Sequence, residues 1–210
     1  MNQLCTKLSR DKYLCALFGI PNIETLDLFE EEQDFTYDSE TVEKELENNR
    51  LYRSMYDVEL VLRFFAMRNL EGYQNQFSDF LDKYLIYANE FGSETLSELS
   101  NIFETTISFA FQLFGKYAFY LWRCRKNQNG LKWGWYERPT TTVYDPLMVV
   151  LSEISPQKER LLDKSKKIRE DIKLFYQENY GVFEGRNSNR SDIEKRIALY
   201  RNFMKNYIED

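Results

Sequence analysis

The sequence predicts an all-α protein: a single, bundle-like, multi-helix domain with about seven helices. Apolar residues recur at helical spacing along most of the chain. Only 8 Gly and 4 Pro are available for the tight turns that an all-β chain of 210 residues would need. Abundant Phe and Tyr supply apolar surface for one substantial core. We expect an acidic N-terminal appendage with short helices over residues 1–50 and the helical domain over residues 51–210.

Residues 56–68 form the most apolar stretch and predict the central helix. Two adjacent stripes at helical spacing cover most of its girth: Val58, Val61, Leu62 and Phe65, and beside them Leu60, Phe64 and Met67. A helix that is apolar over so much of its surface has to be covered by other helices. Glu59 and Arg63 lie four residues apart in the order that favours an ion pair, and we predict that this pair fixes helix packing.

The residues before this helix predict short elements. Ser9 caps a helix that ends before Gly19, and Ser39 caps a helix over 40–48. Residues 24–47 contain 11 acidic side chains and one lysine, which indicates a solvated arm. A Ca²⁺ loop would need a turn glycine, and this segment contains none.

The residues after the central helix predict further helices. The first covers residues 77–85, and the next begins at Ser93 and could continue past Gly115. Residues 127–139 predict a loop, and 140–144 a short extended piece.

Three more helices complete the predicted bundle. Asp145 caps the first of them, with Pro146 at its first position. A long charged helix follows over residues 157–179. Ser191 and Glu194 then form a capping box for the last helix.

The composition limits the chemistry. The absence of histidine excludes HNH and HD metal sites and histidine-based nucleophile triads. The three cysteines have no metal-ligand or disulfide spacing, which favours reduced thiols in a cytoplasmic protein. No apolar run approaches the roughly 18 residues of a membrane span. The sequence therefore predicts no metal, no cofactor and no membrane insertion, and it favours a non-enzymatic role.

Residues 116–138 are basic within an acidic chain. They hold six basic side chains and one acidic, whereas the whole chain carries a net charge of −6. All three tryptophans also lie here, and basic groups interleaved with aromatic ones are typical of surfaces that contact phosphates and stack on bases. The candidate nucleic-acid-binding residues are Arg123, Arg125, Lys126, Lys132, Trp133, Trp135 and Arg138. The alternative is a solvated helix end with tryptophans packed beneath it.

Three segments carry a resemblance to a known family: Asp57–Ala66, Phe114–Phe119, and Ser191 with Arg196 and Ile197. They resemble the helical region of the GmrSD-type restriction family, bacterial proteins of unknown function with a ParB/sulfiredoxin-like domain. The resemblance covers roughly residues 50–205. It implies a role in defence against modified or foreign DNA, a nucleotide-hydrolysing N-terminal domain and often a C-terminal HNH nuclease. The chain lacks both the Asp-Gly-Gln-Gln-Arg motif and histidine, so neither activity carries over.

These patterns predict a non-catalytic helical module of a bacterial DNA-defence protein. It would bind DNA, or dock a ParB-like or HNH nuclease partner domain. The alternative is a structural protein-interaction domain that forms a homodimer or packs on a partner, which predicts a large exposed apolar patch. A third, carboxylate-dependent enzymatic role would need a pocket with two converging acids.

Overall fold

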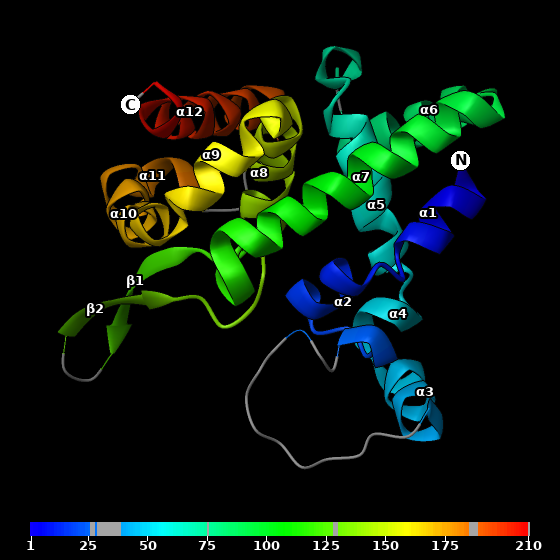
Figure 1. Ribbon diagram of the computed structural model, residues 1–210, viewed down its shortest axis with the longest axis horizontal. Coiled ribbons are helices and arrows are strands. Elements are labelled where there is room, and N and C mark those ends of the chain that lie inside the picture. The colour runs from blue at the N-terminus through cyan, green and yellow to red at the C-terminus, as the bar shows by residue number, and fades with distance from the viewer. Residues whose placement is uncertain (26–27, 29–38, 75, 128–129, 185–188, 210) are drawn as a thin grey trace.

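The computed structural model describes residues 1–25, 28, 39–74, 76–127, 130–184 and 189–209. Its elements are α1 (Asn2–Leu8), α2 (Lys12–Phe18), α3 (Ser39–Asn48), α4 (Arg50–Arg53), α5 (Tyr56–Met67), α6 (Phe77–Ala88), α7 (Ser93–Phe114), β1 (Trp122–Asn127), β2 (Gly130–Trp135), α8 (Thr141–Glu153), α9 (Lys158–Asp163), α10 (Ser165–Glu178), α11 (Tyr180–Phe183) and α12 (Arg190–Ile208), with short 3-10 turns between several of them. The chain is mostly helical, as predicted (Figure 1).

The prediction of about seven helices is wrong, because the described residues form 12 α-helices. Several of these helices are short, and a helix that was predicted as one is divided into two. The helix expected over residues 157–179 breaks at Lys164 into α9 and α10. The helix expected to begin at Ser9 is α2, and it is capped by Asp11, whose carboxylate accepts the N–H groups of Tyr13 and Leu14 at 2.8 and 3.1 Å. Ser9 instead follows the end of α1.

The predicted start of α8 is also wrong. The helix begins at Thr141, and the Thr140 hydroxyl caps it by accepting the N–H of Thr142 at 3.3 Å. The expected extended piece over residues 140–144 is therefore mostly helical, and Asp145 and Pro146 lie inside the helix. A proline inside a helix costs about 3 kcal/mol, which the burial of residues 143–151 has to outweigh.

The predicted loop over residues 127–139 is wrong as well, since β1 and β2 pair there as an antiparallel hairpin. The all-α class therefore holds only as a coarse description. The sequence contained a signal for the hairpin, because residues 122–125 at the start of β1 alternate between apolar and basic and the dipeptide Asn129-Gly130 is typical of hairpin turns.

Two further helix boundaries differ from the predictions. α7 ends at Phe114, because Gly115 has φ 63° and ψ −153°, a conformation that only glycine adopts readily. The guanidinium of Arg169 then donates to the carbonyl oxygens of Gln112 and Leu113, each at 2.7 Å, and satisfies the end of the helix. α12 is capped by Asn189, which accepts the N–H of Asp192 at 2.9 Å, and not by the predicted Ser191 box.

Helices α5 and α8 form the buried centre of the molecule. Leu60, Val61 and Phe64 of α5 are fully buried, which agrees with the predicted central helix. α8 is enclosed even more completely, with a continuous run of buried residues from Val143 to Leu151. The Tyr144 hydroxyl joins the two helices by donating to the carbonyl oxygen of Leu60 at 2.9 Å.

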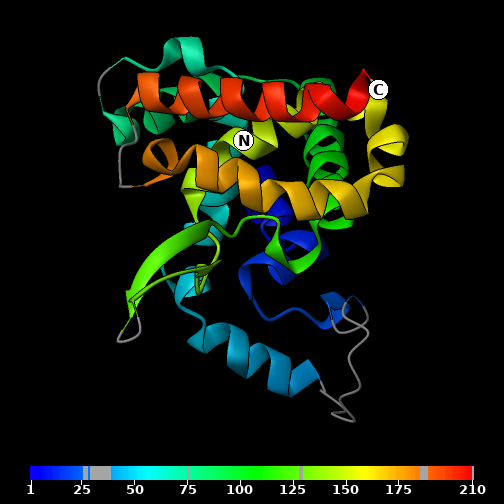
Figure 2. The same ribbon diagram turned by 90° about the vertical axis from the view of Figure 1, so that its left-hand side faces the viewer.

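The remaining helices cover this centre unequally. α1 and α2 lie within residues 1–50, yet Cys5, Leu8 and Leu14 belong to the main core cluster. α3 lies apart from the body and contacts α4 (Figures 1 and 2). Figure 2 shows α10 and α12 side by side, and an aromatic cluster that includes Phe175 and Tyr200 fills the space between them.

Candidate anion-binding cleft

The hairpin sorts the predicted basic and aromatic residues onto two faces. Directly paired residues of antiparallel strands point to the same side of the ribbon. Trp122 pairs with Trp135, and Cys124 with Trp133, which gives one aromatic face. Arg123 pairs with Gly134, and Arg125 with Lys132, which gives a basic face. The interleaving in the sequence therefore becomes a separation in space.

The aromatic face packs against the helical body. The Trp135 ring stacks on Tyr117 with centroids 4.9 Å apart, and the Trp122 and Trp135 rings meet at 5.3 Å. Trp133 contacts the ring of Tyr180 on α11 at 5.5 Å. These contacts hold the hairpin against the body and use the predicted tryptophans for packing.

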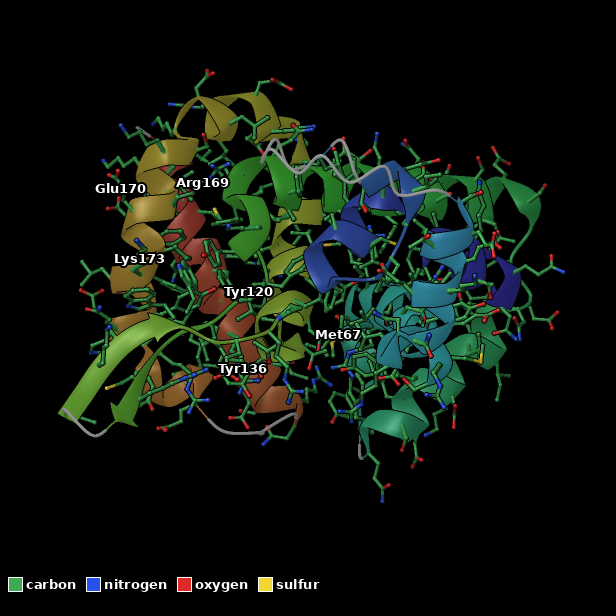
Figure 3. All side chains as sticks on the ribbon, turned by 90° about the horizontal axis from the view of Figure 1, so that it is seen from below. Met67, Tyr120, Tyr136, Arg169, Glu170 and Lys173 are labelled. Carbon is green, nitrogen blue, oxygen red and sulfur yellow. The ribbon has the colours of Figure 1, made fainter. Side chains whose placement is uncertain are left out.

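The basic face surrounds a tyrosine. The guanidinium carbons of Arg123, Arg125 and Arg138 lie 5.2, 5.0 and 6.0 Å from the centroid of the Tyr136 ring. Backbone hydrogen bonds fix this segment, because the N–H of Tyr136 donates to the carbonyl oxygen of Leu121 at 2.8 Å. Figure 3 shows Tyr136 away from Arg169 and Lys173, which lie on α10.

Beside this cluster lies a cleft of about 1000 Å³, which we call the arginine cleft. Helices α4, α5, α8, α11 and α12, strand β1 and the segment after β2 contribute to its walls. Its charged lining among the described residues consists of Arg50, Arg63, Arg123, Arg138 and Arg196, with Asp145 and Glu184. Hydroxyl groups also line it: Ser54, Tyr56, Thr140, Thr141, Thr142 and Tyr180. Five guanidiniums and two carboxylates make the cleft positive in a chain that is acidic overall.

The floor of the cleft is a buried ion pair. Arg63 binds Asp145 through two bonds, from Nε to Oδ1 at 3.0 Å and from Nη2 to Oδ2. Its Nη1 also reaches Glu59 Oε1 at 3.2 Å, the contact expected from the sequence, but Asp145 is the closer and more enclosed partner. Burial lowers the pKa of Arg63, and the negative charge of Asp145 more than reverses this effect, so the net pKa is raised. Arg63 is therefore a fixed cation that joins α5 to α8.

The cations at the mouth of the cleft differ from this one. Within the described residues, no carboxylate lies within 4.0 Å of the guanidinium nitrogens of Arg50, Arg123 or Arg138. Nε of Arg123 is buried without a hydrogen-bond partner. Like charges that share a cavity repel each other, and a positive cleft concentrates anions near it. These three arginines thus offer an uncompensated charge to an anionic ligand.

The structure brings together some of the predicted nucleic-acid-binding residues but not all. Arg123 and Arg138 line the cleft, and Arg125 lies beside them, paired with Glu137 at 2.6 Å. Lys132 is exposed on the basic face, and the side chain of Lys126 lies outside the described residues. Trp133 and Trp135 face the body, as described above.

Sequence reasoning missed several members of the cleft. Arg50, Arg196 and Thr140–Thr142 come from three separate segments, none of which the sequence marks as a binding site, and only the fold brings them to the same place. Tyr136 could have been found, because it lies within the basic segment and next to Arg138.

Metal sites and membrane spans each have requirements that can be compared with the described residues. In the part of the chain that the structure describes, no three Cys, Asp or Glu side chains cluster closely enough to hold a metal ion. None of the described helices combines the length and apolarity that crossing a membrane requires. Comparisons of the chain with protein-family models, with curated proteins and with solved structures found no match.

Proposed function

We propose that the chain is a non-catalytic module that binds nucleic acid through the arginine cleft. The observation that supports this most strongly is the group formed by Arg50, Arg123 and Arg138, which line one cavity and form no ion pair with any carboxylate of the described residues. Guanidinium groups are well suited to phosphate, because their planar fork donates two parallel hydrogen bonds to its oxygens.

The resemblance to the GmrSD-type helical region is compatible with this role. It would place the module in a bacterial DNA-defence protein, where the cleft holds DNA for a catalytic domain carried on another part of the protein or on a partner. The cleft residues do not depend on this resemblance, so nucleic-acid binding can be tested on the chain alone.

The test compares two double variants of equal charge. Arg123→Gln with Arg138→Gln removes two cleft cations, whereas Arg160→Gln with Lys166→Gln removes two exposed cations from α9 and α10. Hydrogen bonds to charged groups contribute about 1.5–3 kcal/mol each, so the cleft variant should lose at least about tenfold in affinity for a DNA oligonucleotide.

The control variant should bind nearly as tightly as the wild type in the same anisotropy titration. Binding of the wild type should weaken steeply between about 50 and 200 mM salt, because phosphate contacts release counterions. Equal losses in the two double variants would show that only net charge matters, and this would contradict a specific cleft.

Protein interaction is the second candidate function. The neighbouring large side chains of Ile86 and Tyr87 on α6 are 71% and 66% exposed. If these side chains form the contact between two copies of the chain, sedimentation should detect a dimer, and Ile86→Lys should dissociate it. A monomer at all accessible concentrations would remove the homodimer form of this alternative.

A further inference from the structure

The arginine cleft continues into a second hollow. This hollow has a volume of about 610 Å³ and lies over the edge of the hairpin. Four residues line both spaces: Arg123, Tyr136, Tyr180 and Glu184. Arg125 and Leu131 extend the second hollow along the hairpin, and Leu131 is 78% exposed. The two hollows together form one track, which runs from the first turn of α8 past Tyr136 to the hairpin.

The cations along this track follow one another. Arg138 and Arg50 belong to the cleft, Arg123 belongs to both hollows, and Arg125 belongs to the second. Two carboxylates lie among them: Glu184 lines both hollows, and Glu137 lines the second, where it pairs with Arg125 at 2.6 Å. The positive charge that the track offers is therefore that of Arg50, Arg123 and Arg138. A single small anion would be satisfied by one or two guanidiniums at one point. A series of cations along a groove matches a polymer with a repeating negative charge.

The cations lie at different depths. Arg50 and Arg138 are exposed at the mouth, whereas Nε of Arg123 is buried and the buried Arg63 forms the floor. A ligand that contacts both depths has to enter the cleft. Duplex DNA presents its phosphates on the outside of a stiff rod, so it reaches cations on open surfaces and through the insertion of helices or strands into its grooves. A flexible strand can instead enter a groove and follow it.

The track also offers flat groups next to its cations. The Tyr136 ring lies among three guanidiniums, and Tyr180 belongs to both hollows. Unpaired bases stack on tyrosine rings and on guanidinium planes. Bases in a duplex cannot do so, because they are already stacked on each other.

From these observations we infer that the ligand of the track is a single-stranded polynucleotide, with its phosphates on Arg50, Arg123 and Arg138 and its bases against Tyr136. This inference rests on the proposed nucleic-acid function and narrows it to one class of substrate. The inference covers both DNA and RNA strands, because the two share the phosphate and base chemistry that the track would recognise.

The experiment measures the affinity of the full chain for four fluorescent probes of about 20 nucleotides, longer than the roughly 4–16 that one small single-strand domain covers. The probes are oligo-dT, oligo-rU, a mixed-sequence DNA strand and the duplex of that strand with its complement. We expect the mixed strand to bind at least about tenfold tighter than its own duplex, and at least one homopolymer to bind comparably.

Two double variants test whether the track causes the preference for single-stranded over duplex probes. Arg123→Gln with Arg138→Gln should reduce the ratio of single-strand to duplex affinity towards one, whereas Arg160→Gln with Lys166→Gln should leave the ratio unchanged. Arg50→Gln, at an exposed position on α4, tests the same ratio if the double variant is poorly folded by circular dichroism.

Three results would overturn the inference. Equal or tighter binding of the duplex would reject the single-strand class while nucleic-acid binding stands. A ratio that the cleft variants do not change would place the strand elsewhere on the protein. Failure of all four probes to bind at about 50 mM salt, where phosphate contacts are strong, would reject the proposed function itself.

Discussion

The floor and the mouth of the arginine cleft use the same side chain in opposite ways. At the floor, Arg63 is enclosed, and its side chain and that of Asp145 are only 9% and 6% exposed. At the mouth, Arg123 and Arg138 have no acidic partner within ion-pair distance among the described residues, and their guanidiniums lie beside Tyr136. An arginine whose charge is neutralised inside the protein can fix helices, while one left without a counter-charge is available to a ligand.

A second ion pair resembles the floor in part. Arg10, just before α2, pairs with Asp57 in the first turn of α5; the Asp57 side chain is only 2% exposed and that of Arg10 is 32% exposed. This pair connects an N-terminal segment to the central helix. Both pairs join elements far apart in the sequence, which indicates that arginines paired with buried carboxylates connect parts of this fold.

The largest effect is expected at the floor. Among the described residues, replacing Asp145 by Ala leaves the buried Arg63 with the half-exposed Glu59 as its remaining ion-pair partner. Breaking a buried pair by removing one partner typically costs about 3–5 kcal/mol, so the free energy of unfolding in urea should fall by that amount. A double variant, Arg63→Met with Asp145→Leu, should recover part of the loss, because no buried charge is left alone. If Asp145→Ala unfolds like the wild type, the pair does not hold α5 to α8.

The floor also shows where sequence reasoning stops. The stripes of α5 and the amphipathic pattern of α6 follow from helical spacing, and both helices form where expected. The sequence Asp145-Pro146 predicts a helix start with Asp145 as its cap, because proline is favoured at the first helical position. Its partner Arg63 lies 82 residues earlier, and only the crossing of α5 and α8 brings them together.

The hairpin was missed for a different reason. Its strands contain charged side chains on one face, so they lack the apolar run that marks a buried strand. The basic segment itself was visible from composition, and this part of the site could be predicted. The separation of tryptophans from arginines could not, because it depends on strand register, which pairs Trp122 with Trp135.

A smaller effect is expected for the buried tyrosine Tyr84, whose ionisation makes the free energy of unfolding depend on pH. Burial raises the pKa of Tyr84 from 10 to about 12. The unfolded chain therefore loses this proton first, and the stability contribution that is complete below pH 10 is lost as the pH rises towards 12. Each unit of difference corresponds to about 1.4 kcal/mol.

The measurement is the urea midpoint at pH 9 and at pH 11. The wild type should lose stability over this interval, and Tyr84→Phe should lose less, because phenylalanine has no proton to lose. An identical pH dependence in the two proteins would show that Tyr84 ionises as easily in the folded state as in the unfolded state.

The smallest effect on stability is expected at the mouth. Arg138 is exposed, and its guanidinium carbon lies 6.0 Å from the centroid of the Tyr136 ring. Arg138→Gln should change the free energy of unfolding by no more than about 0.5 kcal/mol, while the affinity for single-stranded DNA falls. A loss of stability as large as that of Asp145→Ala would show that Arg138 stabilises the fold as Arg63 does, and this would contradict the difference between the floor and the mouth.

The most direct test observes both kinds of arginine in one sample. Nitrogen-edited NMR of the arginine Nε–H groups, assigned by single substitutions, would be followed while an oligo-dT strand is added. We predict that the signals of Arg50, Arg123 and Arg138 shift together, while those of Arg63 and the distant Arg160 stay in place. If the Arg160 signal moves as much as the others, or if none of the three mouth signals moves, the arginines of the cleft are not a binding site.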